Sequence, residues 1–512
     1  MVGQQTTEGA WPKIRRIFLS SNLLSRRNRN NVLAMGIIGF GYTFFEEIVT
    51  TYMQFYYTEF MLLPAAVVAS VLSIGMIIDG VTDFLMGMVI DHLQTKKGRL
   101  RQWFLWMAIP TALATVGVFF CQDSWSVTAK TVYLFVIYNI YCTCMTTIRM
   151  PKTTMISMCF NDPDARQQAN VVSGVLGQFS QLLITAGLPL LLAALGSTAS
   201  AYTNSSIILS AGGILLTMFT YALMREVVGS RAAVQTVRET EGDEAADIME
   251  KILAAEGETT SGKAKDNTKK RNVFKDIGML VANKYWLINM GTSLANGVGI
   301  GFMFGVATYF AQYTLGGVQM LAGVFGTLSI GMMVGIFFAA PVIIKLDSRM
   351  VGVIGSFVGA LGMAIAAVGI LGFNSLAMFH VGLFVRQLGT GFIIAINGDM
   401  TARVIDYGEW RFGYRIDGLA FSGSAVMSKI MSAAATAILG FTLTAVGYQG
   451  GMAELPATAL SAINNMFLWV PCVALVVSGI FYIMLNLSNK RVAEMRAEIA
   501  ARALKKPENT EI

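Results

Sequence analysis

Long, continuous apolar stretches separated by short polar connections occupy most of the chain. Within each stretch, apolar residues follow one another instead of alternating with polar ones, and each exceeds the about 20 residues that a helix needs to cross a bilayer. Such stretches predict membrane-spanning helices, because backbone polar groups in lipid must be bonded within their own segment. The predicted helices are 32–60, 64–92, 101–122, 130–159, 168–197, 204–224, 285–314, 318–345, 350–372, 375–403, 416–446 and 459–487.

A polar stretch at 225–284 divides these helices into two sets of six. Within it, DEAADIMEKILAAE predicts a short surface helix, and the remainder is typical of a flexible linker. We therefore expect an all-α membrane protein of twelve helices with the outline of the major facilitator fold, in which two halves surround a central cavity. Its predicted parts are an N-terminal tail (1–31), a six-helix half (32–224), the central loop (225–284), a second six-helix half (285–487) and a C-terminal tail (488–512).

Composition and charge agree with a membrane protein. Hydrophobic residues make up 54% of the chain and charged residues 13%, whereas soluble domains carry about a quarter charged residues. With the N-terminus in the cytoplasm, 33 of the 38 Lys and Arg residues fall in predicted cytoplasmic segments and one, Lys130, falls in an outward loop. This asymmetry predicts a multi-pass protein of the inner cell membrane with both termini and the central loop in the cytoplasm. The net charge of +7 reflects the same asymmetry and requires no nucleic-acid partner.

Motifs for catalysis or for a metal centre are not found in the sequence. The five cysteines lack metal-ligand spacing with the two histidines, which argues against zinc sites and disulfide scaffolds. There is no nucleophile–base constellation and no phosphate-binding glycine motif. We therefore expect no enzyme, no catalytic residue and no cofactor. A receptor is disfavoured too, because the loops and tails are too short and polar for a signalling domain.

Two acids in the second predicted helix indicate a cation site. Asp79 and Asp83 are four residues apart, so they lie on one face of the helix, one turn from each other. Each is costly in lipid and must face the bundle interior or a wet cavity, and the two carboxylates repel each other. A hard cation such as Na⁺ or Li⁺, or a proton, would relieve both costs, with Thr82 and Thr146 as added oxygen ligands. The alternative is that the acids only pair with an arginine and hold helices together.

Further charges lie inside predicted helices and are candidates for substrate contact or for helix pairing. For Glu46 and Arg149, an interhelical ion pair and direct substrate contact remain equally open. For Arg386 and Asp399, structural pairing or helix-end placement is favoured over ligation. The candidate substrate-binding residues are Glu46, Arg149, Lys152 and Lys429, and the residues assigned to conformational roles are Gly87, Asp91 and Asp406.

Several motifs together resemble one known family. They are FYYTEF at the end of the first helix, Asp79, Asp83, Gly87 and Asp91 at four-residue spacing followed by TKKGRLRQW, Pro151 followed by NDPDAR, and VIDYGEWRFGYRIDGLAFS with Lys429 downstream. In these features the chain resembles the glycoside–pentoside–hexuronide:cation symporters, whose best-known members are the melibiose permeases. The resemblance implies a cation site at Asp79 and Asp83 with Thr82 near it and Thr146 as a ligand, and it places Lys429 at the junction of the cation and sugar sites.

The chain also departs from that family pattern. Where melibiose-type members carry a sugar-binding acid in the fourth helix, this chain has Arg149, and the usual fifth-helix arginine falls near Gly174. The first-helix sugar acid is absent near Thr43, although Glu46 lies one turn further on. An arginine suits a carboxylate or sulfonate because its planar fork binds two oxygens. We therefore hypothesise an anionic glycoside such as a hexuronide. A swapped Glu46–Arg149 pair is the alternative.

These observations predict symport of a sugar or glycoside with Na⁺ or H⁺, by rocking of the two halves about a midplane site. The partners would be a small solute, the cation and the lipid bilayer, and a monomer is expected. The alternative is a carrier or exporter of amphiphilic, lipid-like solutes on the same fold, because 31 methionines and 31 phenylalanines suit an adaptable apolar cavity.

Overall fold

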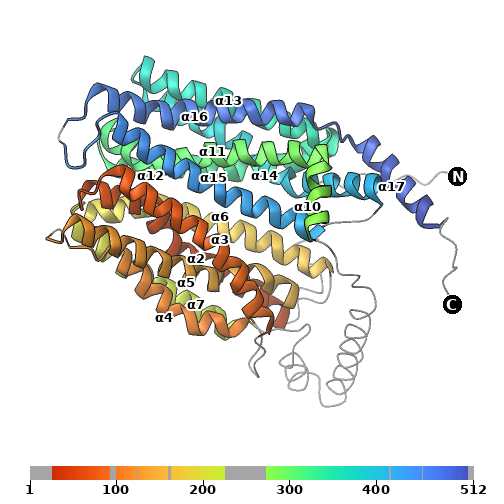
Figure 1. The fold of residues 1–512 in the computed structure, drawn as a ribbon, viewed down its shortest axis with the longest axis horizontal. Helices are drawn as coiled ribbons and strands as arrows, with labels where there is room; N and C mark the ends of the chain where they lie inside the picture. Colours follow the sequence, from red (N-terminus) through yellow and green to blue (C-terminus); the bar gives the residue numbers. More distant parts are fainter. Residues whose placement is uncertain are drawn as a thin grey trace, which may run out of the picture.

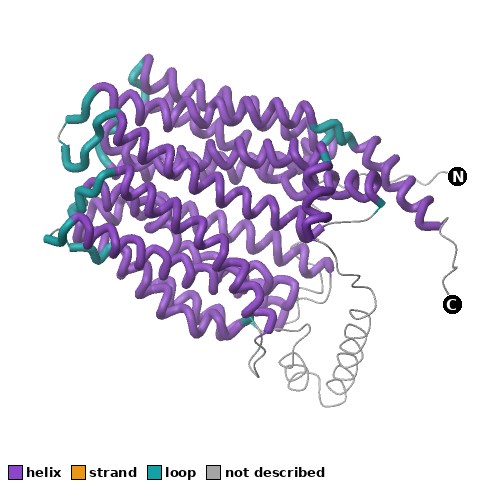
Figure 2. The backbone as a smooth tube through the Cα atoms, viewed as in Figure 1, coloured by secondary structure: helices purple, strands orange, loops and turns teal. Residues whose placement is uncertain are grey.

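A computed structural model describes residues 26–92, 100–122, 124–159, 163–224, 273–413, 417–452 and 454–504. This part of the chain contains helices joined by loops at the ends of the bundle and contains no strand (Figure 2). Within it, nine helices are long and apolar enough to cross a membrane. The prediction of an all-α membrane protein is confirmed. The predicted surface helix in the central loop lies outside the described residues.

The first half consists of six long helices that pack on one another and are coloured red to yellow in Figure 1. They are α2 (Arg26–Glu59), α3 (Ala65–His92), α4 (Arg101–Val118), α5 (Val127–Cys159), α6 (Pro163–Ala194) and α7 (Ala199–Leu223).

A second set of six long helices, green to blue in Figure 1, makes up the other half. It consists of α11 (Lys284–Tyr313), α12 (Leu321–Lys345), α13 (Ser348–Ala367), α14 (Leu376–Phe412), α15 (Asp417–Ala445) and α16 (Ala457–Met484). Short elements accompany them: α10 (Val273–Ala282), the 3₁₀ turn η2 (Val318–Met320), the π-helical turn η3 (Val368–Gly372) and α17 (Asn489–Leu504).

Helix α2 begins at Arg26, within the predicted N-terminal tail, and two other elements differ more from the sequence-based boundaries. The tenth predicted helix, α14, continues nine residues beyond 403 and ends at Phe412, where Gly413 adopts a left-handed φ of 81°. The DYGEW motif therefore lies in the last turns of a helix and not in a loop. The predicted C-terminal tail contains helix α17, which packs on α14 through the buried side chains of Val492 and Met495.

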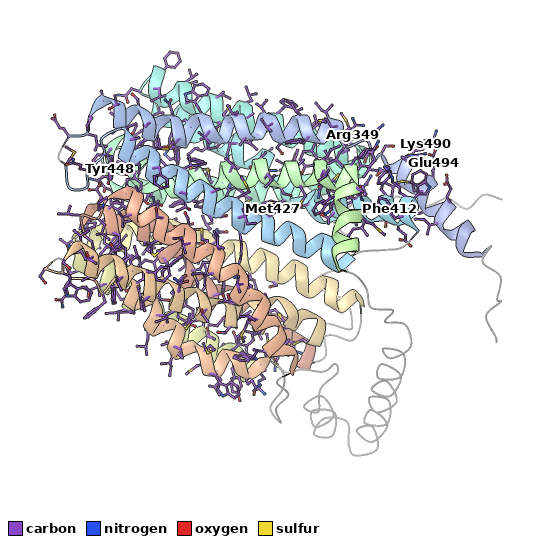
Figure 3. All side chains as sticks on the ribbon, viewed as in Figure 1. Arg349, Phe412, Met427, Tyr448, Lys490 and Glu494 are labelled. Atoms are coloured by element: carbon purple, nitrogen blue, oxygen red, sulfur yellow. The ribbon has the colours of Figure 1, made fainter. Side chains whose placement is uncertain are left out.

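The bundle has two distinct ends. We call the end where α2 begins and α16 ends the terminal end, and the other the opposite end (Figure 1). In Figure 3, Arg349, Lys490 and Glu494 lie at the terminal end, whereas Tyr448 lies at the opposite end. The halves meet where α3 packs on α15, α6 on α12 and α2 on α11. Gly440 of α15 allows the first of these contacts, because a Cβ there would collide with Ala69 and with the Ala65 carbonyl.

Hydrogen bonds join the two halves at the opposite end. The carboxylate of Glu59, the last residue of α2, accepts bonds from the hydroxyls of Tyr313 and Tyr448 and, at 2.9 Å, from the backbone N–H of Gly451. One residue earlier, the hydroxyls of Thr58 and Tyr309 lie 2.7 Å apart. We call the contacts of Glu59 the Glu59 lock. Since its acceptor belongs to the first half and its donors to the second, it holds this end closed.

Replacing Glu59 with glutamine is expected to open this end more often. The glutamine loses the charge that strengthens three hydrogen bonds, and hydrogen bonds to charged groups contribute about 1.5–3 kcal/mol each. A cysteine placed at buried Thr308 of α11, whose hydroxyl donates to the Thr51 carbonyl at 3.0 Å, should react several-fold faster with an impermeant maleimide in the Glu59→Gln protein. The exposed acid Glu454 provides the control Glu454→Gln. Equal labelling rates in the two variants would contradict a locking role.

Candidate cation and solute site

The two acids of α3 share their partners, as their spacing implies. Asp79 and Asp83 are one helical turn apart, and their side chains are 13% and 17% exposed. Nη2 of Arg149 lies 2.8 Å from Oδ1 of Asp83 and 3.4 Å from Oδ2 of Asp79. A single guanidinium nitrogen therefore contacts both carboxylates.

Helix α5 supplies a hydroxyl to the same acids. Oγ1 of Thr146 lies 3.0 Å from Oδ1 of Asp79 and 2.7 Å from Oδ1 of Asp83. Thr146 precedes Arg149 by three residues, which places both on one face of α5, and Nη2 of Arg149 lies 3.3 Å from the threonine oxygen. The packing of α3 on α5 brings these groups together.

The fifth member of the cluster comes from the other half of the protein. Nζ of Lys429, on α15, lies 2.7 Å from Oδ2 of Asp79 and also bonds Oδ2 of Asp83. We call Asp79, Asp83, Thr146, Arg149 and Lys429 the charge cluster. Two negative and two positive side chains give it a net formal charge of zero, and the two bases bond to the carboxylate oxygens that would otherwise bind a small cation. Their side chains are 33% and 25% exposed, so the bases are more accessible than the two acids that they bond.

Three other predicted site residues are not members of the charge cluster: Thr82, Glu46 and Lys152. The hydroxyl of Thr82 donates to the carbonyl of Asp79 at 3.0 Å, within its own helix, and not to the acids. Glu46 accepts a bond of 2.6 Å from the hydroxyl of Tyr42, whose ring lies 4.2 Å from Nζ of Lys152. Among the described residues, the ion pairs of Arg149 are with the acids of α3 and not with Glu46.

The three residues assigned to conformational roles lie near the terminal end of their helices. Gly87 and Asp91 occupy the last turns of α3, but what surrounds these two residues lies outside what the structure describes. Asp406 is 5% exposed and accepts bonds of 2.7 and 2.6 Å from Nε and Nη2 of Arg496 in α17. It therefore ties α14 to the C-terminal helix, within the second half.

Arg403 of α14 is a central residue of that region and was not predicted from the sequence. Its side chain, 8% exposed, lies 2.7 Å from Asp399, 3.0 Å from Asp347 and 2.5 Å from the side chain of Asn489. The i,i+4 spacing of Asp399 and Arg403 was the available signal. Asp399 thus has the structural pairing expected of it, with Arg403 as its partner.

Together, the fold and the charge cluster define a class of protein. Two six-helix halves are joined at midspan by an ion cluster between α3, α5 and α15, and this architecture is that of a multi-pass membrane transporter with its site between the halves. The fold itself has a solved counterpart: the inward-open xylose transporter XylE from E. coli superimposes with a TM-score of 0.63 at 12% identity, over 93% of this chain and 100% of that one.

The family follows from the comparison of sequences. A family model described as MFS/sugar transport protein matches residues 34–256 and again residues 251–489, so the chain belongs to this family of major facilitator transporters. It is similar to the isoprimeverose transporter of Lactiplantibacillus pentosus, at 28% identity over 89% of this chain and 88% of that one. It is also similar to the glucuronide carrier protein homolog of Escherichia coli, at 23% identity over 87% and 89% of the two chains. The resemblance drawn from the motifs is confirmed, and the chain is a transporter and not an enzyme.

Proposed function

We propose that this protein couples the entry of a sugar or glycoside to Na⁺ or H⁺. The observation that carries the proposal is the charge cluster, in which two acids of the first half are balanced by Arg149 and by Lys429 of the second half. Membership in a sugar-transport family and the family motifs of α3 support it. We place the terminal end in the cytoplasm, since the positive-inside rule assigns both termini there, and expect a monomer surrounded by lipid in the cytoplasmic membrane.

Cation binding would exchange one positive charge in the cluster for another. Na⁺ prefers oxygen ligands, and the carboxylates with the Thr146 hydroxyl offer them within about one helical turn. Lys429 and Arg149 occupy these oxygens, so the cation competes with the bases. A proton acts equivalently, because it neutralises one carboxylate and weakens its hold on both bases.

This competition links the cation to the movement of the halves. Lys429 bonds across the interface, so its release from Asp79 and Asp83 loosens α3 from α15 near midspan. Release of Arg149 at the same time separates its guanidinium on α5 from the acids of α3. Coupling between two sites is reciprocal, so the solute strengthens cation binding to the same degree, and a coupling of about 1–3 kcal/mol changes affinity about 5–150-fold.

Uptake in proteoliposomes is the test of this proposal. Purified protein is reconstituted and given an inward gradient of Na⁺ or of H⁺, and the accumulation of radiolabelled neutral and acidic glycosides is followed. We expect one gradient to drive at least one glycoside above its equilibrium level, which also identifies the cation. Equilibration without accumulation under both gradients would show facilitated diffusion and contradict coupling.

A further inference from the structure

Arg386 of α14 is a buried charge without an acidic partner in the described residues. Its side chain is 2% exposed, and the contact described for its guanidinium is from Nη1 to the amide oxygen of Gln387. Its Nε is buried and has no hydrogen-bond partner in the part of the chain that the structure describes. Asp399, which shares this helix, lies 13 residues away, about 20 Å along the helix axis, and bonds Arg403 instead.

Such a buried arginine is unfavourable unless another molecule supplies a counter-ion and hydrogen-bond acceptors. An arginine keeps its charge in proteins and has five N–H donors in a rigid fork. A buried charge without a counter-ion is strongly destabilising, and each unmade hydrogen bond adds to this cost. The geometry therefore leaves room for an acceptor that carries negative charge.

Arg386 lines a cavity of about 190 Å³ between the two halves of the protein. Gln181 and Thr185 of α6 form the wall from the first half. The amide nitrogen of Gln181 donates to Glu47 at 3.2 Å, which leaves its oxygen as an acceptor for hydroxyls. The wall from the second half comes from α11, α12 and α14 and includes Ile300, Phe304, Phe325, Leu328, Ser329, Met332, Gln387, Thr390 and Ile394.

The size and lining of the cavity suit one small, polar ring. Its volume is below the about 300 Å³ at which pockets for drug-sized ligands begin. Phe304 and Phe325 stack with their ring centroids 5.7 Å apart and form an apolar wall, while amides, hydroxyls and one guanidinium supply polar contacts. A hydroxyl-rich ring with one flat apolar face and one anionic group matches this lining.

We propose that this cavity binds the anionic group of an acidic monosaccharide unit, with Arg386 as its charge partner. The inference rests on the proposed transport function and names its substrate class. Arg149, the arginine favoured by the sequence for this role, is already balanced by Asp79 and Asp83. Arg386 has no acidic partner among the residues that the structure describes, so a carboxylate here gains a charge-assisted, two-oxygen contact without breaking a described ion pair. Because the walls belong to both halves, the bound sugar also contacts both partners of the rocking motion.

Two sugars that differ only at carbon six test the proposal. Binding of methyl β-glucuronide and methyl β-glucoside to the purified full-length protein is measured by titration and by thermal stabilisation, at fixed ionic strength. We expect the wild type to bind the glucuronide at least about tenfold more tightly, as a charge-assisted pair implies. Arg386→Gln should reduce this ratio to about one, and Arg386→Lys, which keeps the charge but not the fork, should give an intermediate ratio.

Two further variants make the outcome unambiguous. Arg411→Gln changes an exposed arginine at the end of the same helix and should keep the wild-type ratio. Gln181→Leu should weaken both sugars alike, since it removes an uncharged contact in the other half. A wild type without preference for the glucuronide, or an Arg386→Gln protein that keeps the preference, would overturn the proposal. Glucuronide preference without cation-driven uptake would instead overturn coupling and leave this site standing.

Discussion

Asp83→Asn is expected to abolish cation-driven accumulation of solute while slow downhill exchange persists. The substitution keeps the shape of the side chain but leaves Asp79 alone with Arg149 and Lys429, so the charge cluster changes from zero to +1. A small cation then meets net repulsion where it formerly met two carboxylates. Gradient-driven uptake into proteoliposomes measures the loss, and counterflow without a gradient measures the remaining exchange.

The neighbouring threonine supplies the control. Thr82 lies one residue from Asp83, but its hydroxyl bonds the carbonyl of its own helix, so Thr82→Val should leave the cation dependence unchanged. Full accumulation by the Asp83→Asn protein would show that the cation binds elsewhere. Loss of accumulation in the Thr82→Val protein would return Thr82 to the ligand set that the sequence suggested.

Lys429→Gln is expected to have the reverse effect on cation binding. It leaves two carboxylates against Arg149 alone, so the cluster becomes −1. One unit charge at about 4 Å contributes about 4 kcal/mol at an effective dielectric constant of about 20, and a third of that is already about a tenfold change in affinity. Na⁺ without solute should therefore raise the melting temperature of the variant more than that of the wild type, with half-maximal effect at a concentration at least about tenfold lower.

Lys284→Gln serves as the matched control, since Lys284 is an exposed lysine at the start of α11. A simple loss of stability would weaken both the binding of Na⁺ and transport, and the expected effect of Lys429→Gln differs from this. Lys429→Gln removes the bond between α3 and α15, so binding of Na⁺ improves while its coupling to movement is lost. An unchanged response to Na⁺ in the Lys429→Gln protein would contradict competition between this ammonium and the cation.

The helices could be predicted from the sequence because their cause is local. Apolar stretches longer than a bilayer require helices whatever surrounds them, and the twelve long helices agree with the predicted ones to within a few residues at most ends. The exceptions are informative. Helix α14 continues through DYGEW because buried side chains such as Tyr407 and Asp406 pack against neighbouring elements. Helix α17 forms where the composition is polar, since it docks on α14 through the buried apolar residues Val492 and Met495 and through the pair of Arg496 with Asp406.

The site could be predicted only where it depended on a single helix. The four-residue spacing places Asp79 and Asp83 on one face of α3 irrespective of any neighbour. The partner of Arg149 depends instead on the rotation of α5 relative to both α2 and α3, and the sequence left Glu46 and a substrate equally open. The unbalanced charge of Arg386 is still less visible in a sequence, because it depends on which acids fail to approach it from other helices.

The zero net charge of the cluster has a consequence for the energy source of transport. When no cation is bound, the cluster itself moves no charge through the membrane, so at this site the electrical potential acts only on the loaded step. One monovalent cation with an uncharged sugar carries one elementary charge. A membrane potential that is negative inside would favour its entry by about 2.3 kcal/mol per 100 mV. The same cation with a singly acidic sugar is electroneutral, and its accumulation would follow the concentration gradients alone.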